Sequence, residues 1–147
     1  MGLWDETLEA YGRPGVPEAC LVLQDSYGQN TSFLLWAVWA ETADADLLAR
    51  AADVAHRWEA VALAPIRAVR RGLKPAFPGV ADAAREDLRE DVKAVELRCE
   101  RLLMEALEGM TEGRGGAHAL SALEAASKAW GKPAPDDALA ALAAALS

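Results

Sequence analysis

Four basic side chains stand close together in a stretch that holds no acidic residue: Arg67, Arg70, Arg71 and Lys74. Residues 60–81 sum to +4 and the rest of the chain to −12, which together give the net charge of −8. At 100° per residue, the four cations form a stripe about a quarter to a third of a turn from the apolar face of their helix. Arginine can make two parallel hydrogen bonds to a phosphate or carboxylate, so this basic stripe is where the chain could hold an anion.

The basic stripe also has structural explanations. Long basic stems cover apolar surface while their charged heads stay in water. Glu96 and Glu100 lie at the edge of the apolar side of a later, long helix, where they can meet arginines as charge-assisted pairs. We expect the cations to be solvated or structurally paired. Two alternatives stay open, namely a small anionic ligand and a protein partner, and the exposure of the four cations decides between them.

The aromatic residues form a second cluster. Trp36 and Trp39 are three residues apart in one predicted helix, and Trp58 lies in the next. Aromatic residues at helical spacing are typical of a hydrophobic core, which is our first expectation. The alternative is a pocket in which indole N–H groups orient a ligand.

Motifs for catalysis or metal binding do not occur in the sequence. It holds no H-E-x-x-H, paired C-x-x-C, P-loop or dinucleotide fingerprint. Asp53 precedes His56 by three residues, but a di-iron bundle needs two Glu-x-x-His motifs and further carboxylates. Cys20 lies in an apolar run with no base nearby, which indicates a packed thiol. We therefore expect no catalytic residue, no metal and no cofactor.

The composition narrows the class of protein. A chain of 147 residues with 52% hydrophobic residues can bury a core without metals or disulfides. The acidic balance argues against nucleic acid or an anionic membrane as a partner. The longest apolar run, residues 33–40, is too short to span a membrane, and the first residues do not resemble a secretion signal. With Cys20 and Cys99 expected as free thiols, the cytoplasm is the predicted location.

The sequence predicts a series of helices, and these helices must position the residues described above. Pro17 and Gly28 bracket one helix, and Asn30, Thr31 or Ser32 can cap the apolar segment 33–40. A helix from Asp44 is expected to kink or end at Pro65. The longest helix is predicted over residues 80–110, with an apolar stripe of Leu88, Val92, Val95, Cys99, Leu102 and Ala106. These signals predict an all-α fold, a compact bundle of about six or seven helices with a central apolar helix.

The domain organisation follows from the glycine-rich stretch TEGRGG. We expect residues 1–110 to form the main helical domain and residues 111–116 a flexible linker. Residues 117–147 then form C-terminal helices packed on the same domain.

Two groups of residues carry a resemblance to a known family. The first comprises Tyr11, Pro14-Gly15-Val16, Ala19-Cys20-Leu21, Leu23-Gln24-Asp25, Gly28, Leu34-Leu35 and Trp39. The second comprises Trp58, Pro65-Ile66-Arg67, Arg70-Arg71, Leu73-Lys74, Val92-Lys93, Glu96-Leu97 and Glu100-Arg101. Over residues 3–110 the chain resembles a bacterial family of short proteins known only as a domain of unknown function (DUF2390). One departure is Ser32, where the family pattern leads us to expect asparagine. The resemblance implies an all-helical, cytoplasmic protein and no particular activity.

These observations lead to two hypotheses about function. The first is a non-catalytic cytoplasmic protein that acts through protein–protein interaction. The second is a binder of a small anionic ligand, which uses the basic stripe together with a tryptophan-lined pocket. The sequence does not indicate an oligomeric state.

Overall fold

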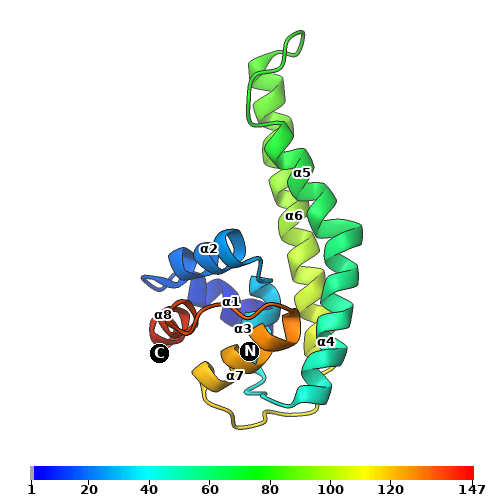
Figure 1. The fold of residues 1–147 in the computed structure, drawn as a ribbon. Helices are drawn as coiled ribbons and strands as arrows, with labels where there is room; N and C mark the ends of the chain where they lie inside the picture. Colours follow the sequence, from blue (N-terminus) through cyan, green and yellow to red (C-terminus); the bar gives the residue numbers. More distant parts are fainter. Residues whose placement is uncertain (1) are drawn as a thin grey trace.

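The computed structural model describes residues 2–147 and is helical throughout its regular elements (Figure 1). Eight α-helices and one π-helical turn make up the elements of this described part. They are α1 (Leu3–Tyr11), α2 (Val16–Tyr27), α3 (Thr31–Trp39), α4 (Ala45–Trp58), η1 (Glu59–Leu63), α5 (Ala64–Gly72), α6 (Asp82–Gly109), α7 (Ala119–Trp130) and α8 (Asp136–Leu146). The all-α prediction is confirmed. Beyond the bundle, α5 and the facing half of α6 project as a long helical hairpin (Figure 1).

Helix α3 is the centre of the core, as predicted. Asn30 caps it, because the Asn30 Oδ1 accepts a hydrogen bond from the Phe33 N–H at 3.0 Å. Every residue from Ser32 to Ala37 is buried. Helix α7 packs on α3 and α4, and α8 packs on α2. The C-terminal half of α6 packs on α3. A helix that is apolar on all sides therefore lies where every side has a neighbour.

The helical rod from Ala45 to Gly72 changes from α-helix to a π-helical turn and back directly before Pro65, where we expected a kink or an end. The π-helical turn η1 directly precedes the first turn of α5, in which Pro65 lies. Proline lacks the N–H that a continuing helix needs, and it is tolerated best in a first turn. The wider turn holds one more residue than an α-turn, so it shifts all later side chains by about 100° around the axis. This shift sets the side of α5 that faces α6.

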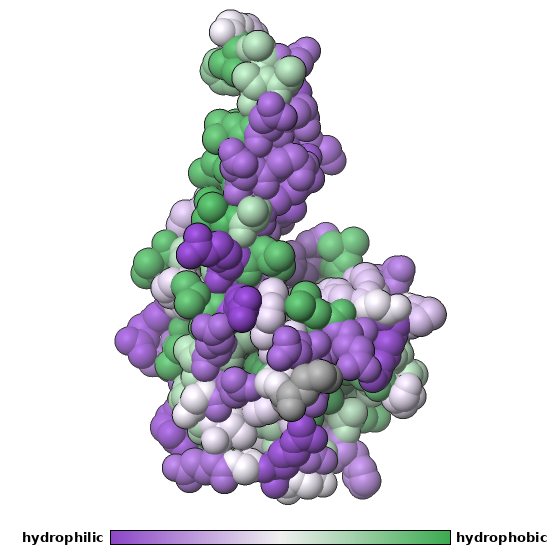
Figure 2. Space-filling model, turned by 180° about the vertical axis from the view of Figure 1, so that it is seen from behind, coloured by the Kyte–Doolittle hydropathy of each residue, from purple (hydrophilic) through white to green (hydrophobic). Residues whose placement is uncertain are grey.

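The apolar stripe predicted for α6 is only half covered. Val92 is buried and Cys99 is half-buried, but Leu88, Val95 and Leu102 are 51%, 44% and 53% exposed. The sequence pattern alone led us to expect the whole stripe to face a neighbouring helix. Figure 2 shows hydrophobic side chains at the surface along one side of the projecting hairpin, next to a hydrophilic side. Because α5 covers only one edge of the stripe, its other edge faces solvent.

Arg85 closes the far end of the hairpin. Its Nε donates to the Leu73 carbonyl at 3.1 Å, and its guanidinium pairs with Asp82 at 2.9 Å and Glu86 at 3.0 Å. The side chain is buried although it is charged. These bonds tie the end of α5 to the start of α6.

The segment 111–116, for which we expect a flexible linker, crosses the end of α3. The Trp36 Nε1–H donates to the Thr111 Oγ1 at 2.9 Å, and the Gly115 N–H donates to the Ala40 carbonyl at 3.0 Å. The Ala117 N–H then donates to the Glu41 carbonyl at 2.9 Å. Two contacts within the segment and one directly after it therefore hold its course here, and its flexibility stays a prediction.

No helix within residues 2–147 combines the length and apolar character that crossing a membrane requires.

Candidate functional site

The basic stripe divides into a paired half and an exposed half. Arg67 lies between two carboxylates, with Nη1 at 3.5 Å from Glu59 and Nη2 at 3.8 Å from Glu100. Arg70 pairs with Glu96 at 2.9 Å. These five residues of η1, α5 and α6 form a junction at the base of the hairpin, which we call the ion-pair junction. Its side chains are 12–30% exposed, and its ion pairs join η1 and α5 to α6.

The exposed half of the basic stripe consists of Arg71 and Lys74, neither of which has an ion-pair partner among residues 2–147. The stripe is therefore part scaffold and part free surface.

Burial sets the electrostatics of the ion-pair junction. The pKa of Glu100 lies above its usual value, first because the carboxyl is buried. Arg67 opposes this rise, Glu96 adds to it through like-charge repulsion, and Arg70 opposes it again. Burial thus disfavours the charged form of Glu100, and Arg67 favours it.

A polar cleft of about 570 Å³ opens beside the junction, between the end of α2 and the start of α5. Its polar lining consists of Gln24, Asp25, Gln29, Glu59, Arg67 and Arg71. The Gln29 Nε2 donates to the Lys132 carbonyl at 3.0 Å, whereas its buried Oε1 has no partner in the described residues. The buried Asn30 donates from Nδ2 to Glu59 at 3.5 Å. The cleft thus presents negative charges, positive charges and amide groups to anything that enters it.

The three candidate tryptophans lie apart from this cleft. Trp36 is fully buried, with its N–H on Thr111. The Trp58 Nε1–H donates to the Cys99 carbonyl at 2.8 Å and ties α4 to α6. Trp39 lies 5.5 Å below the guanidinium of Arg114 in a different part of the molecule. The structure therefore does not bring the basic stripe and the tryptophans into one pocket.

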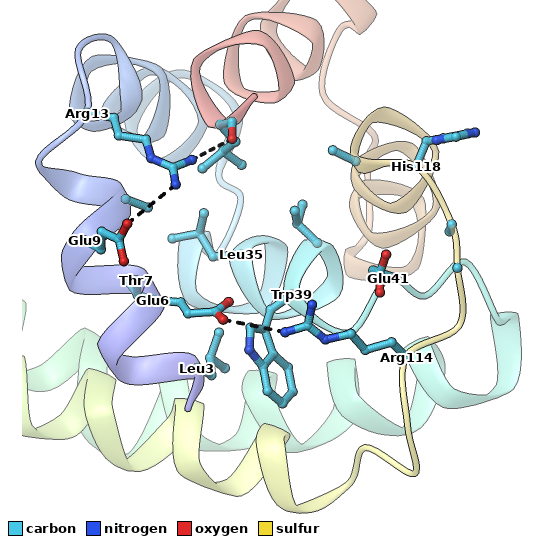
Figure 3. Close-up of a pocket in the computed structure, with 16 residues that line it drawn as sticks. Leu3, Glu6, Thr7, Glu9, Arg13, Leu35, Trp39, Glu41, Arg114 and His118 are labelled. Atoms are coloured by element: carbon cyan, nitrogen blue, oxygen red, sulfur yellow. Dashed lines mark hydrogen bonds and ion pairs between the residues drawn. The ribbon is translucent and has the colours of Figure 1, made fainter. Parts of the chain in front are cut away.

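Trp39 lines a second cleft, of about 670 Å³, between α1, α3 and the segment that leads to α7 (Figure 3). Leu3 and Leu35 form part of its apolar floor. Arg114 pairs with Glu6 at 3.6 Å across the rim. Arg13 pairs with Glu9 at 3.9 Å and donates to the Leu146 carbonyl at 2.7 Å. Both arginines of the rim are thus already neutralised by glutamates of α1.

Cys20 and His56, the two side chains considered for chemistry in the sequence, each contact neighbouring residues. Burial raises the pKa of the Cys20 thiol to about 11, although a hydrogen bond from Tyr11 lowers it in part. The His56 ring stacks on Trp130 with centroids 3.5 Å apart, and its Nε2 lies 2.8 Å from the Trp130 carbonyl. Across residues 2–147, no three His, Cys, Asp or Glu side chains gather where they could hold a metal ion.

The uncovered edge of α6 is a feature that the sequence reading missed. Leu88, Val95 and Leu102, which we call the α6 seam, are seven residues apart and lie in one line along the helix. That spacing was visible in the sequence as part of the apolar stripe. The sequence did not indicate which edge of the stripe is covered by α5. Glu59 was missed as well, because its contact with Arg67 depends on the π-helical turn between them.

The family described as "Protein of unknown function (DUF2390)" matches residues 2–107 of this chain. The chain belongs to this family. The match covers α1 to α5 and most of α6, so it includes the hairpin, the ion-pair junction and the α6 seam. Helices α7 and α8, which complete the core around α3 and α2, lie beyond the match. No curated protein and no solved structure matches the sequence.

Proposed function

We propose that the protein acts by binding another protein through the α5–α6 hairpin, without chemistry of its own, in the cytoplasm. The observation that carries this proposal is the α6 seam, in which three large apolar side chains in line are each about half exposed. Burial of apolar surface stabilises by about 25 cal/mol per Å², so an exposed row of apolar side chains favours association. The two free thiols, Cys20 and Cys99, support a reducing compartment.

The construction of the hairpin suits a binding element. The ion-pair junction fixes its base, and the bonds of Arg85 fix its far end. A surface that is already ordered before binding loses less conformational entropy on association. The hairpin therefore presents the α6 seam on a pre-organised support.

Affinity capture from the native lysate tests this proposal when it is paired with matched variants. The triple variant Leu88→Ser/Val95→Ser/Leu102→Ser removes the seam. Leu97→Ser is the control, because Leu97 is 49% exposed on the same helix but lies about 160° around the axis from Val95. We expect wild type and the control to retain the same protein and the triple variant to lose it. Retention by all three, or by none, contradicts the proposal.

The polar cleft supports a second, weaker candidate function, the binding of a small anionic ligand. Its support is Arg71, whose guanidinium lines the cleft without an ion-pair partner in the described residues. Asp25 and Glu59 line the same cleft, and their charge opposes an anion. Inorganic phosphate, titrated while the side-chain amide NMR signals of Gln24 and Gln29 are followed, tests this candidate. A saturable shift that Arg71→Ala abolishes and Lys74→Ala keeps supports it, and the lack of such a shift contradicts it.

A further inference from the structure

The α6 seam is symmetric about its middle residue. Leu88 precedes Val95 by seven residues, and Leu102 follows it by seven. At 1.5 Å per residue the seam is about 21 Å long. Helix α6 extends from Asp82 to Gly109, so Val95 also lies at the middle of the whole helix. A two-fold axis through Val95 would therefore superpose the seam on itself and the helix on its full length.

Two charges of opposite sign lie at nearly symmetric positions beside the seam. Asp91 precedes Val95 by four residues, and Arg98 follows it by three. At 100° per residue, both lie on one flank of the seam, about 40° and 60° from Val95. Both are exposed, and neither forms an ion pair with another of the described residues. A two-fold axis through Val95 would bring each of these charges close to the opposite charge on the second copy.

We propose that two copies of this chain pair through their α6 seams, antiparallel, with a two-fold axis at Val95. This inference rests on the proposed use of the hairpin as an interface and names the partner as a second copy. In an antiparallel pair, equivalent flanks meet, so Asp91 lies by the partner's Arg98 and Arg98 by the partner's Asp91. A parallel pair would instead hold Asp91 level with the partner's Asp91.

The small number of seam residues sets the strength of this association. Three half-exposed apolar side chains per copy make an interface at the weak, transient end of the known range. The net charge of −8 on each copy opposes association, most strongly at low salt. We therefore expect a dissociation constant of roughly 1–100 μM at physiological ionic strength. Sedimentation velocity over a concentration series covers this range.

Charge reversal provides the first test, because each changed side chain is on the surface. Asp91→Arg and Arg98→Asp each create two like-charge contacts across the proposed axis, and the double variant restores two opposite-charge contacts. We expect each single variant to weaken the dimer at least tenfold and the double variant to recover most of the affinity. A monomeric wild type at several hundred micromolar, or a double variant no tighter than the singles, overturns the inference.

A cysteine on the proposed axis provides the second test. In a Cys99→Ala background, where the remaining Cys20 is buried, Val95→Cys should meet its own copy and form a disulfide dimer under mild oxidation. Leu97→Cys is the control and should stay monomeric. Equal cross-linking of both variants, or none at Val95, contradicts the pairing. A monomeric wild type that still captures a different protein through the seam overturns self-pairing and leaves the proposed function intact, whereas loss of both overturns both.

Discussion

Replacing Arg67 by methionine tests whether the ion-pair junction holds the hairpin to the body. The Arg67 side chain is 15% exposed, and its guanidinium lies between Glu59 and Glu100, both less than a third exposed. Breaking a fully buried ion pair costs about 3–5 kcal/mol, and an exposed pair contributes about 0–1 kcal/mol. Since this site lies between the two cases, we expect Arg67→Met to lower the free energy of unfolding by about 2 kcal/mol. Arg71→Met, one turn further along α5 and exposed, should lower it by less than about 0.5 kcal/mol.

The loss caused by Arg67→Met should also depend on pH. Burial already holds the folded-state pKa of Glu100 above its usual value, and Arg67 is the main group that opposes this. Without Arg67 that pKa rises further, so the folded state binds a proton more tightly than the unfolded state does. Stability then falls as pH rises through the interval between the two pKa values and is regained below it. The loss relative to wild type should therefore be larger at pH 7 than at pH 5, by about 1.4 kcal/mol for each unit by which the substitution raises the folded-state pKa within that range.

Urea unfolding at the two pH values measures both effects. The double variant Arg67→Met/Glu100→Gln provides a check, because it removes the carboxylate that has lost its partner. We expect it to be more stable at pH 7 than Arg67→Met alone, since a neutral amide costs less to bury than an unpaired charge. A loss no larger than that of Arg71→Met, or one that is the same at both pH values, would refute this reasoning.

Three further substitutions test local features of the fold by urea unfolding. Glu41, at φ 50°, occupies the left-handed position after α3, so Glu41→Gly should raise the free energy of unfolding by about 0.5–1 kcal/mol, and an unchanged or lower value contradicts this. A Cβ at Gly115 would lie 2.6 Å from the Glu41 carbonyl oxygen, so Gly115→Ala should cost about 1–3 kcal/mol, while Gly109→Ala, which meets nothing within 4 Å, should cost none. Asn30→Ala removes the cap of α3 and should cost about 1–2 kcal/mol; a loss below about 0.3 kcal/mol would show that the cap contributes little.

Local signals in the sequence were sufficient to predict most of the helices. Gly28, at φ 64°, ends α2 in the left-handed conformation that glycine adopts without strain, and Asn30 caps the next helix. The apolar run of α3 predicted its central place because no side of it could face water. These features depend on a few neighbouring residues and on the helical period, and both can be recognised from the sequence alone.

Features that depend on the relation between helices could not be read in the same way. Pro65 predicted a kink or an end of the helix, but it did not predict the π-helical turn that precedes it and rotates α5. That rotation decides that Arg67 and Arg70 face α6 while Arg71 stays exposed. It also decides which edge of the α6 stripe is covered. The polar cleft could not be predicted for a related reason. Its lining combines residues from the end of α2 with residues of η1 and α5, which are distant in the sequence.

Site-specific photo-cross-linking in the living cell tests most directly the central claim that the α6 seam is a protein-binding surface. A benzophenone amino acid is placed at Val95 and, as the control, at Glu90, which is 66% exposed and about 140° around the same helix. We expect a defined adduct from position 95 and none from position 90, with the mass of a dimer if the partner is a second copy. No adduct from position 95, or the same adducts from both positions, would contradict this claim.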